Sequence, residues 1–132
     1  LVTRHSAAEA KLKNLRALLA TADDSMRTHT QEMLKQIGSK TLAVTLPSET
    51  INQTLEENYQ LILLDLDNTP KASLNASVRL RQRKHQGAIV GITSKLTQIG
   101  FSTCREAGMN SCLYYPLEKD RLVHTIMQWC TV

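Results

Sequence analysis

The stretch LILLDLDNTP, residues 61–70, decides the fold of this chain. Four apolar residues lead directly into Asp65, and a polar loop ending at Pro70 follows. An apolar run without polar alternation predicts a strand buried on both faces, as strands in a parallel sheet are. Side chains at the carboxyl ends of such strands line the place where ligands bind or react. Asp65 is therefore the first candidate functional residue.

Further short apolar runs lie on either side of this stretch, and segments with helical spacing separate them. The expected strands are residues 15–20, 41–46, 59–65, 88–93 and 111–115. The expected helices are residues 25–37, a short helix after a cap at Ser48, residues 72–84 marked by Leu74 and Val78, a short helix near 102–108, and residues 118–130. Because crossover helices cover both faces of a parallel sheet, this alternation predicts an α/β domain with a five-stranded parallel sheet.

The length and composition indicate one small globular domain. A chain of 132 residues with 42% hydrophobic and 21% charged residues can bury one core without disulfides or metal. No run of about 18 apolar residues suggests a membrane span, and three cysteines without a CxxC pair fit a reducing cytoplasm. We expect a soluble cytoplasmic domain over residues 15–132, excised from a longer protein and preceded by a linker or tail over residues 1–14.

The net charge of +4 gathers most densely in RLRQRKH, residues 79–85. No aromatic residue interleaves these cations to stack on bases, so nucleic-acid binding is not expected. A solvated helix face and helix end is the preferred interpretation, and a patch for an acidic partner is the alternative. We likewise expect no membrane contact by this domain.

Asp65, Asp67 and Thr69 form the pattern Asp-x-Asp-x-Thr, which resembles the opening motif of haloacid-dehalogenase-type phosphatases. The resemblance implies that Asp65 attacks phosphorus, that Asp67 handles the leaving-group proton and that Mg²⁺ neutralises developing charge. Thr93 resembles the hydroxyl of that family's second motif. The family also needs a later acidic pair, and after Thr93 this chain has only scattered acidic residues.

From about Leu12 to Trp129 the chain resembles the receiver domains of two-component signalling. The matching segments, in chain order, are LKNLRALLATADDSMRTHTQEMLKQIG, YQLILLDLD, VRLRQRKHQGAIVGITS and REAGMNSCLYYPLEKDRLVHTIMQW. The resemblance implies a flavodoxin-like (βα)5 arrangement, a phosphoacceptor at Asp65 and a switch hydroxyl at Thr93. The chain is also similar to the receivers that lie inside bacterial hybrid sensor histidine kinases.

The chain departs from the receiver pattern where the family binds Mg²⁺. Receivers carry two acidic residues after the first strand, and Thr21 and Ala22 stand at those positions here. Asp23 and Asp24 follow directly. We expect Asp24 to cap the first helix, and Asp23 is the alternative metal ligand beside Asp65. Magnesium is therefore the one cofactor to test, and none is expected to be required.

A second departure lies where the family compensates the phosphoryl charge. Tyr115 stands at the position of the usual lysine before Pro116. A phenol donates one hydrogen bond but brings no positive charge, so a phosphoryl group on Asp65 would lose much of its stabilisation. The loop after Asp65 is also one residue longer than usual, because Pro70 comes five residues later.

A receiver without phosphoryl chemistry still has its surfaces, so we expect a degenerate receiver, or pseudo-receiver, that acts by protein–protein contact. The domain itself is not expected to be an enzyme, although the resemblance implies a histidine kinase as the longer chain. The expected partners are the kinase core, other receiver or phosphotransfer domains of the same system, or a second copy. The residues expected on the contact face are Arg105, Cys112, Tyr114 and Tyr115.

Two alternatives stay open from the sequence. The first is a working receiver that accepts a phosphoryl group on Asp65 and holds Mg²⁺ with Asp23. The second is a small phosphatase that uses Asp65 and Asp67. Phosphorylation separates the first alternative from a pseudo-receiver, and turnover of a phosphate ester separates the second.

Overall fold

The computed structural model describes residues 10–95 and 100–130. The strands are β1 (Arg16–Ala20), β2 (Lys40–Val44), β3 (Leu61–Asp65), β4 (Ala88–Thr93) and β5 (Ser111–Tyr114). The helices are α2 (Asp24–Gln36), α3 (Glu49–Glu56), α4 (Pro70–Gln82), α6 (Phe101–Glu106) and α7 (Lys119–Trp129). All strand pairs are parallel and the order is β2-β1-β3-β4-β5, so the expected five-stranded sheet is confirmed.

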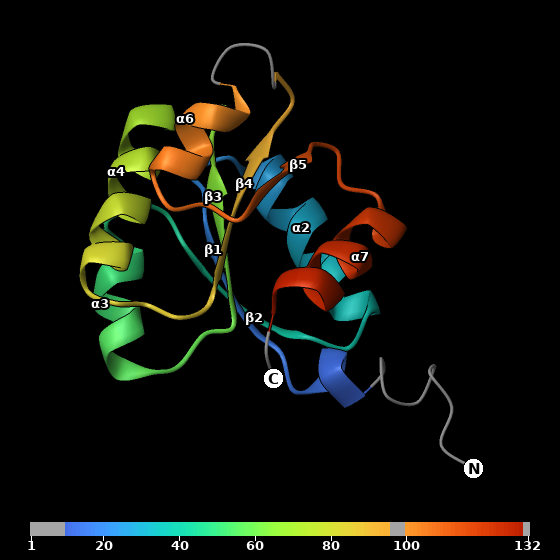
Figure 1. The fold of residues 1–132 in the computed structure, drawn as a ribbon. Helices are drawn as coiled ribbons and strands as arrows, with labels where there is room; N and C mark the ends of the chain where they lie inside the picture. Colours follow the sequence, from blue (N-terminus) through green and yellow to red (C-terminus); the bar gives the residue numbers. More distant parts are fainter. Residues whose placement is uncertain (1–9, 96–99, 131–132) are drawn as a thin grey trace.

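Helices cover the sheet on both faces, with α3, α4 and α6 on one side and α2 and α7 on the other (Figure 1). The central strand β3 is buried along its whole length, and successive residues point to opposite faces. Leu61 and Leu63 pack in the core cluster under α2 and α7, whereas Ile62 and Leu64 pack in the cluster under α3 and α4. Asp65 ends this apolar strand at the centre of the sheet.

Helix α4 buries smaller side chains than the sequence pattern suggested. Val78 is 36% exposed and Leu74 only partly buried, whereas Ser73 and Ser77 are fully buried. Ser73 Oγ donates to the backbone oxygen of Asp65 at 2.6 Å, and Ser77 Oγ donates to that of Ala107 at 2.7 Å. Because each hydroxyl has a backbone partner, small polar residues can face the core and let α4 approach the sheet closely.

The helix caps correct two expectations. Asp23, not Asp24, is the N-cap of α2, because its backbone is extended and its side chain accepts from Met26 N at 2.9 Å. Asp24 lies inside the first turn and pairs with Arg27 at 2.6 Å. Ser48 stands at the N-cap position of α3, but its hydroxyl makes no capping hydrogen bond.

The segment before β1 is only partly described, because residues 1–9 of the expected linker lie outside the described residues. Leu12, which precedes the expected domain boundary, is buried in the core, and its backbone oxygen accepts from Ser39 Oγ at 2.9 Å. Within the described residues, no helix has the length and apolar character needed to cross a membrane.

Gly108 tests how tightly α4 packs against the chain after α6. Its φ is +96°, and an added Cβ would run into the side chain of Arg81. Gly38 is the matched control, because it follows α2 as Gly108 follows α6, has a φ of +88°, and an added Cβ there would meet only Lys13 Cγ at an ordinary 3.6 Å. Both changes to alanine cost about 1–2 kcal/mol of backbone strain. We expect urea unfolding to show that Gly108→Ala lowers the free energy of unfolding by at least about 1 kcal/mol more than Gly38→Ala. Equal losses would show that Arg81 moves aside without cost.

Candidate functional site

The carboxylate of Asp65 is fully enclosed by hydrogen-bond donors. Oδ1 accepts from the backbone N–H groups of Asp67 and Asn68 at 2.8 and 3.0 Å. Oδ2 accepts from the Thr21 hydroxyl at 2.7 Å and from the Asn68 side-chain amide at 2.8 Å. Asp65 is 0% exposed. Each oxygen therefore already has two donors, and neither faces solvent.

Asn68 is a site residue that the sequence analysis missed. It donates to Asp65 from both its backbone and its side chain, although the residue itself is exposed. The available signal was a side-chain amide three residues after a strand-end carboxylate, a spacing at which polar side chains often bond to the local chain. Asn68 closes the solvent side of the carboxylate.

Thr93 lies at the end of β4, next to β3, but its hydroxyl does not bond to Asp65. Thr93 Oγ1 donates to Asp67 Oδ1 at 2.8 Å and accepts from Lys95 N at 2.9 Å. Ser94 also binds Asp67, through its backbone N–H at 2.9 Å and through its hydroxyl at 2.7 Å. Asp67 thus fastens the loop after β3 to the end of β4.

These contacts also set the charge state of Asp67. Burial acts to raise the pKa of this carboxyl group, but hydrogen bonds from Ser94 and Thr93 and the positive charge of Lys95 outweigh burial. The pKa of Asp67 therefore lies below its ordinary value of 3.8. Asp67 is a carboxylate at neutral pH, and its oxygens are engaged within the loop.

Tyr115 follows β5, and its phenol is not among the donors to Asp65. Its backbone N–H donates to Thr93 O at 3.0 Å, so the chain itself passes close to the site. The ring instead packs edge-on against the His29 ring of α2, with 5.5 Å between centroids and 89° between planes. His29 Nε2 lies 3.2 Å from the backbone oxygen of Leu117, which fixes the two rings between α2 and the loop after β5.

The residues at this site do not fit Mg²⁺. Thr21 occupies an expected acidic position and already bonds to Asp65, while Ala22 is exposed and offers no ligand. Asp23 directs its carboxylate to the N-terminus of α2. Among residues 10–95 and 100–130, no group of three or more His, Cys, Asp or Glu side chains could hold a metal ion. A cation would first have to displace donors from Asp65.

The four residues expected on a contact face are separated by the structure. Tyr114 is 53% exposed and Arg105 is exposed, whereas Tyr115 is partly buried. Cys112 is buried beside Cys104, and burial raises the pKa of its thiol to about 12. A hollow of about 570 Å³ between α6, β5 and α7 adds Phe101 and His124, which the sequence analysis did not single out.

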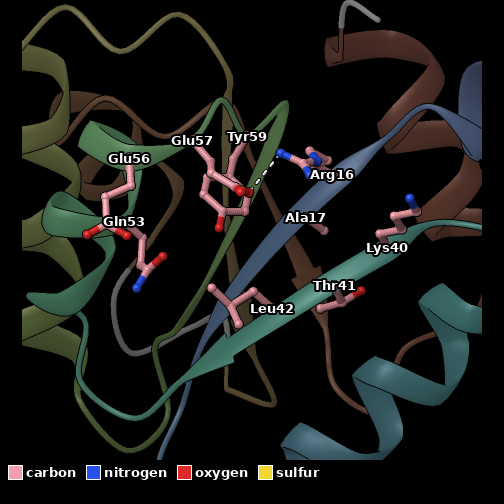
Figure 2. Close-up of a pocket in the computed structure, with 9 residues that line it drawn as sticks. All are labelled: Arg16, Ala17, Lys40, Thr41, Leu42, Gln53, Glu56, Glu57 and Tyr59. Atoms are coloured by element: carbon pink, nitrogen blue, oxygen red, sulfur yellow. Dashed lines mark hydrogen bonds and ion pairs between the residues drawn. The ribbon is translucent and has the colours of Figure 1, made fainter.

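A second hollow, of about 410 Å³, lies at the other edge of the sheet (Figure 2). Arg16 and Lys40, the first residues of β1 and β2, line it together with Glu57, which pairs with Arg16 at 2.7 Å. These amino ends lie at the opposite end of the parallel sheet from Asp65 and Thr93, which are the last residues of β3 and β4. None of the residues proposed from the sequence for phosphoryl chemistry lines this hollow.

Comparison with known proteins finds relatives in sequence and similar folds among solved structures. The chain is 32% identical over 128 residues to Two-component response regulator 24 of Arabidopsis thaliana, covering 92% of this chain and 91% of that protein. It is 25% identical over 117 residues to the CAI-1 autoinducer sensor kinase/phosphatase CqsS of Vibrio cholerae, covering 86% of this chain but 17% of that protein. No protein-family model matches the chain.

The fold is similar to that of the receiver domain of sensor histidine kinase PA1611 from Pseudomonas aeruginosa PAO1. The TM-score is 0.78 with 21% sequence identity, and the match covers 87% of this chain and 96% of that one. That structure has a magnesium ion coordinated in its active site cleft. At this identity the likeness concerns the fold alone.

Removing the Thr21 hydroxyl tests how much Asp65 depends on it. Thr21→Val keeps the shape but leaves a buried carboxylate oxygen short of one donor, so we expect the free energy of unfolding to fall by about 1–3 kcal/mol. Thr30→Val is the control, because Thr30 Oγ1 is buried without a partner among the described residues. Chemical denaturation should show no loss for Thr30→Val. Similar values for both variants would contradict a special role for Thr21.

The hydrogen bonds that Thr93 and Ser94 donate to Asp67 should make the stability of the fold depend on pH. Because the folded pKa lies below 3.8, the carboxylate contributes stability above that pH and loses it as pH falls through the folded value. We expect Asp67→Asn to lower the free energy of unfolding by on the order of 1 kcal/mol at neutral pH. The difference from wild type should become smaller as the pH falls toward about 3. Glu32→Gln, an exposed carboxylate on α2, is the control for urea unfolding across pH. If the difference in free energy of unfolding between wild type and Asp67→Asn stays constant across pH, the Asp67 carboxylate does not stabilise the fold in this way.

Proposed function

This chain belongs to the receiver-domain family of two-component signalling, and from that premise we propose that it is a pseudo-receiver. It acts as a binding module that transmits signals through its surfaces, without storing a phosphoryl group on Asp65. The observation that carries the proposal is the fully hydrogen-bonded, 0% exposed carboxylate of Asp65.

Accepting a phosphoryl group requires an oxygen of Asp65 to attack phosphorus from an open side. Thr21 and Asn68 occupy Oδ2, and two backbone N–H groups occupy Oδ1, so attack needs the loop after β3 to open first. The bond to phosphorus would also bring further negative charge into a site where Tyr115 stands at the position of the family's usual lysine. Tyr115, packed on His29, supplies no cation there.

The second support is the position of the Thr93 hydroxyl. In the family this hydroxyl is expected to respond to the phosphoryl group, but here it donates to Asp67 at 2.8 Å. The end of β4 is thereby held by the side chain of Asp67. The carboxyl ends of β3 and β4 keep one arrangement whether or not a phosphoryl donor is present.

We place the partners of the domain among the kinase core, receiver domains and phosphotransfer domains of its own signalling system. This follows from its likeness to a response regulator and to one segment of a sensor kinase. The surface that fits this role is the hollow between α6, β5 and α7, where the exposed rings of Phe101 and Tyr114 stand beside α7.

A working phosphoacceptor is the second candidate, because Asp65 and Thr93 both keep their places at neighbouring strand ends. Opening of the loop at Asn68 would be its first step. The phosphatase alternative has no such support, since the chain belongs to another family and Asp67 is engaged by Thr93 and Ser94.

Intact-mass analysis separates the two receiver candidates. The folded domain is incubated with Mg²⁺ and a small acyl-phosphate donor, alongside an Asp65→Asn control. We expect no gain of a phosphoryl mass in the wild-type domain, because no oxygen of Asp65 is free to attack and the position of the family's usual lysine holds Tyr115. A phosphoryl gain in wild type that is absent from Asp65→Asn would overturn the proposal.

A variant that carries the family's residues at these positions is the positive control for detecting a gain of phosphoryl mass. Thr21→Asp, Ala22→Asp and Tyr115→Lys together return the acidic pair and the ammonium group of the family pattern. We expect this triple variant, confirmed as folded by circular dichroism, to take up the phosphoryl group that the wild-type domain does not.

A further inference from the structure

The segment over residues 70–87, α4 and the turn after it, is the most cationic part of the chain. It contains five Lys or Arg residues and no Asp or Glu, whereas the whole chain has a net charge of only +4. The rest of the chain is therefore close to neutral. A cationic surface of this kind attracts acidic partners.

The structure separates one of these cations from the others. Arg81 turns inward and donates to the backbone oxygens of Gly108 at 2.9 Å and His85 at 2.7 Å, and to Asn110 Oδ1 at 2.8 Å. Arg81 therefore holds α4 against the chain that follows α6. Arg79 and Arg83 are exposed, and neither makes a salt bridge within the described part of the chain.

A small groove runs beside Arg79, between α3 and α4, which lie next to each other on one face of the sheet (Figure 1). Its volume is about 150 Å³. The residues that form its walls include Leu46, Pro47 and Ile51 on the α3 side and Ala72, Ala76 and Arg79 on the α4 side. Small alanines on α4 leave room for a side chain to enter.

One exposed leucine lines this groove, and a second follows on α3. Leu46 is 54% exposed at its wall. Leu55 is 62% exposed and lies four residues after Ile51, so the two share one side of α3. Arg83 in turn lies four residues after Arg79, which places a second cation along the same side of α4. An apolar strip and a row of two guanidinium groups therefore run next to each other.

We propose that the α3–α4 groove docks an acidic amphipathic helix of a partner protein. Apolar side chains of that helix enter the groove at Leu46 and beside Leu55, and its carboxylates meet Arg79 and Arg83. Arginine matches carboxylates with paired hydrogen bonds, and a helix presents apolar and acidic groups at the required spacing of three and four residues. The proposal does not depend on the phosphorylation state of Asp65.

The occupant is a peptide rather than a nucleic acid because residues 70–87 contain no Phe, Tyr or Trp to stack on a base. Phosphate groups alone would also make no use of the exposed leucines. An acidic, apolar helix uses both features of the surface, the uncompensated charge and the exposed hydrocarbon.

The test uses a displayed library of random 16-residue peptides selected on the wild-type domain. We expect the selected peptides to carry Leu, Ile or Phe at helical spacing together with Asp or Glu. Their affinity, measured by fluorescence anisotropy, should fall about tenfold or more in Arg79→Glu/Arg83→Glu and also in Leu46→Ser. Selected peptides that are neutral or basic, or that bind both variants as tightly as wild type, would overturn the proposal.

A charge-matched control separates the groove from the net charge of the domain. Lys35→Glu/Lys119→Glu makes the same change in net charge on α2 and α7, on the opposite face of the sheet. We expect it to weaken binding by no more than about twofold at physiological salt. An equal loss in both double variants would show general attraction and overturn the proposal. So would a dimer in sedimentation velocity that Arg79→Glu/Arg83→Glu abolishes, because the occupant would then be a second copy.

Discussion

A negative charge at the centre of the sheet, out of contact with water, has to be met by donors on every side. Asp65 meets this requirement with donors from two directions: the Thr21 hydroxyl after β1, and the loop that follows β3. Its backbone oxygen is bound as well, by Ser73 from the first turns of α4. One buried residue thus ties together β1, β3 and α4.

The same constraint governs how the carboxyl end of the sheet is held together. In a site built for Mg²⁺, carboxylates repel one another until a cation joins them. Here a hydroxyl and an amide face Asp65, so hydrogen bonds stabilise its charge. The second carboxylate, Asp67, turns away and binds Thr93 and Ser94 at the end of β4. The two aspartates therefore fasten different strand ends and do not compete for one ligand.

In the proposed function, a site closed in this way leaves the outer surfaces of the helices to carry the interactions of the domain. Two of the surfaces with exposed apolar side chains lie on different parts of the fold, one around Phe101 and Tyr114 and one around Leu46 and Arg79. Arg81, between them in sequence, holds the chain after α6 against α4 through hydrogen bonds to Gly108 and Asn110.

The sequence by itself determined the five strands, the parallel sheet and the strand-end positions of Asp65 and Thr93, because apolar runs and helical spacing are local properties. It also located Thr21 and Tyr115 where the family carries charged groups. Only the tertiary structure decided which aspartate caps α2, that Asn68 covers Asp65 and that Thr93 binds Asp67. It also decided that Arg81 points inward while Arg79 stays exposed. Each of these depends on contacts between segments far apart or on a one-residue shift in a turn, and such contacts leave no periodic pattern in the sequence.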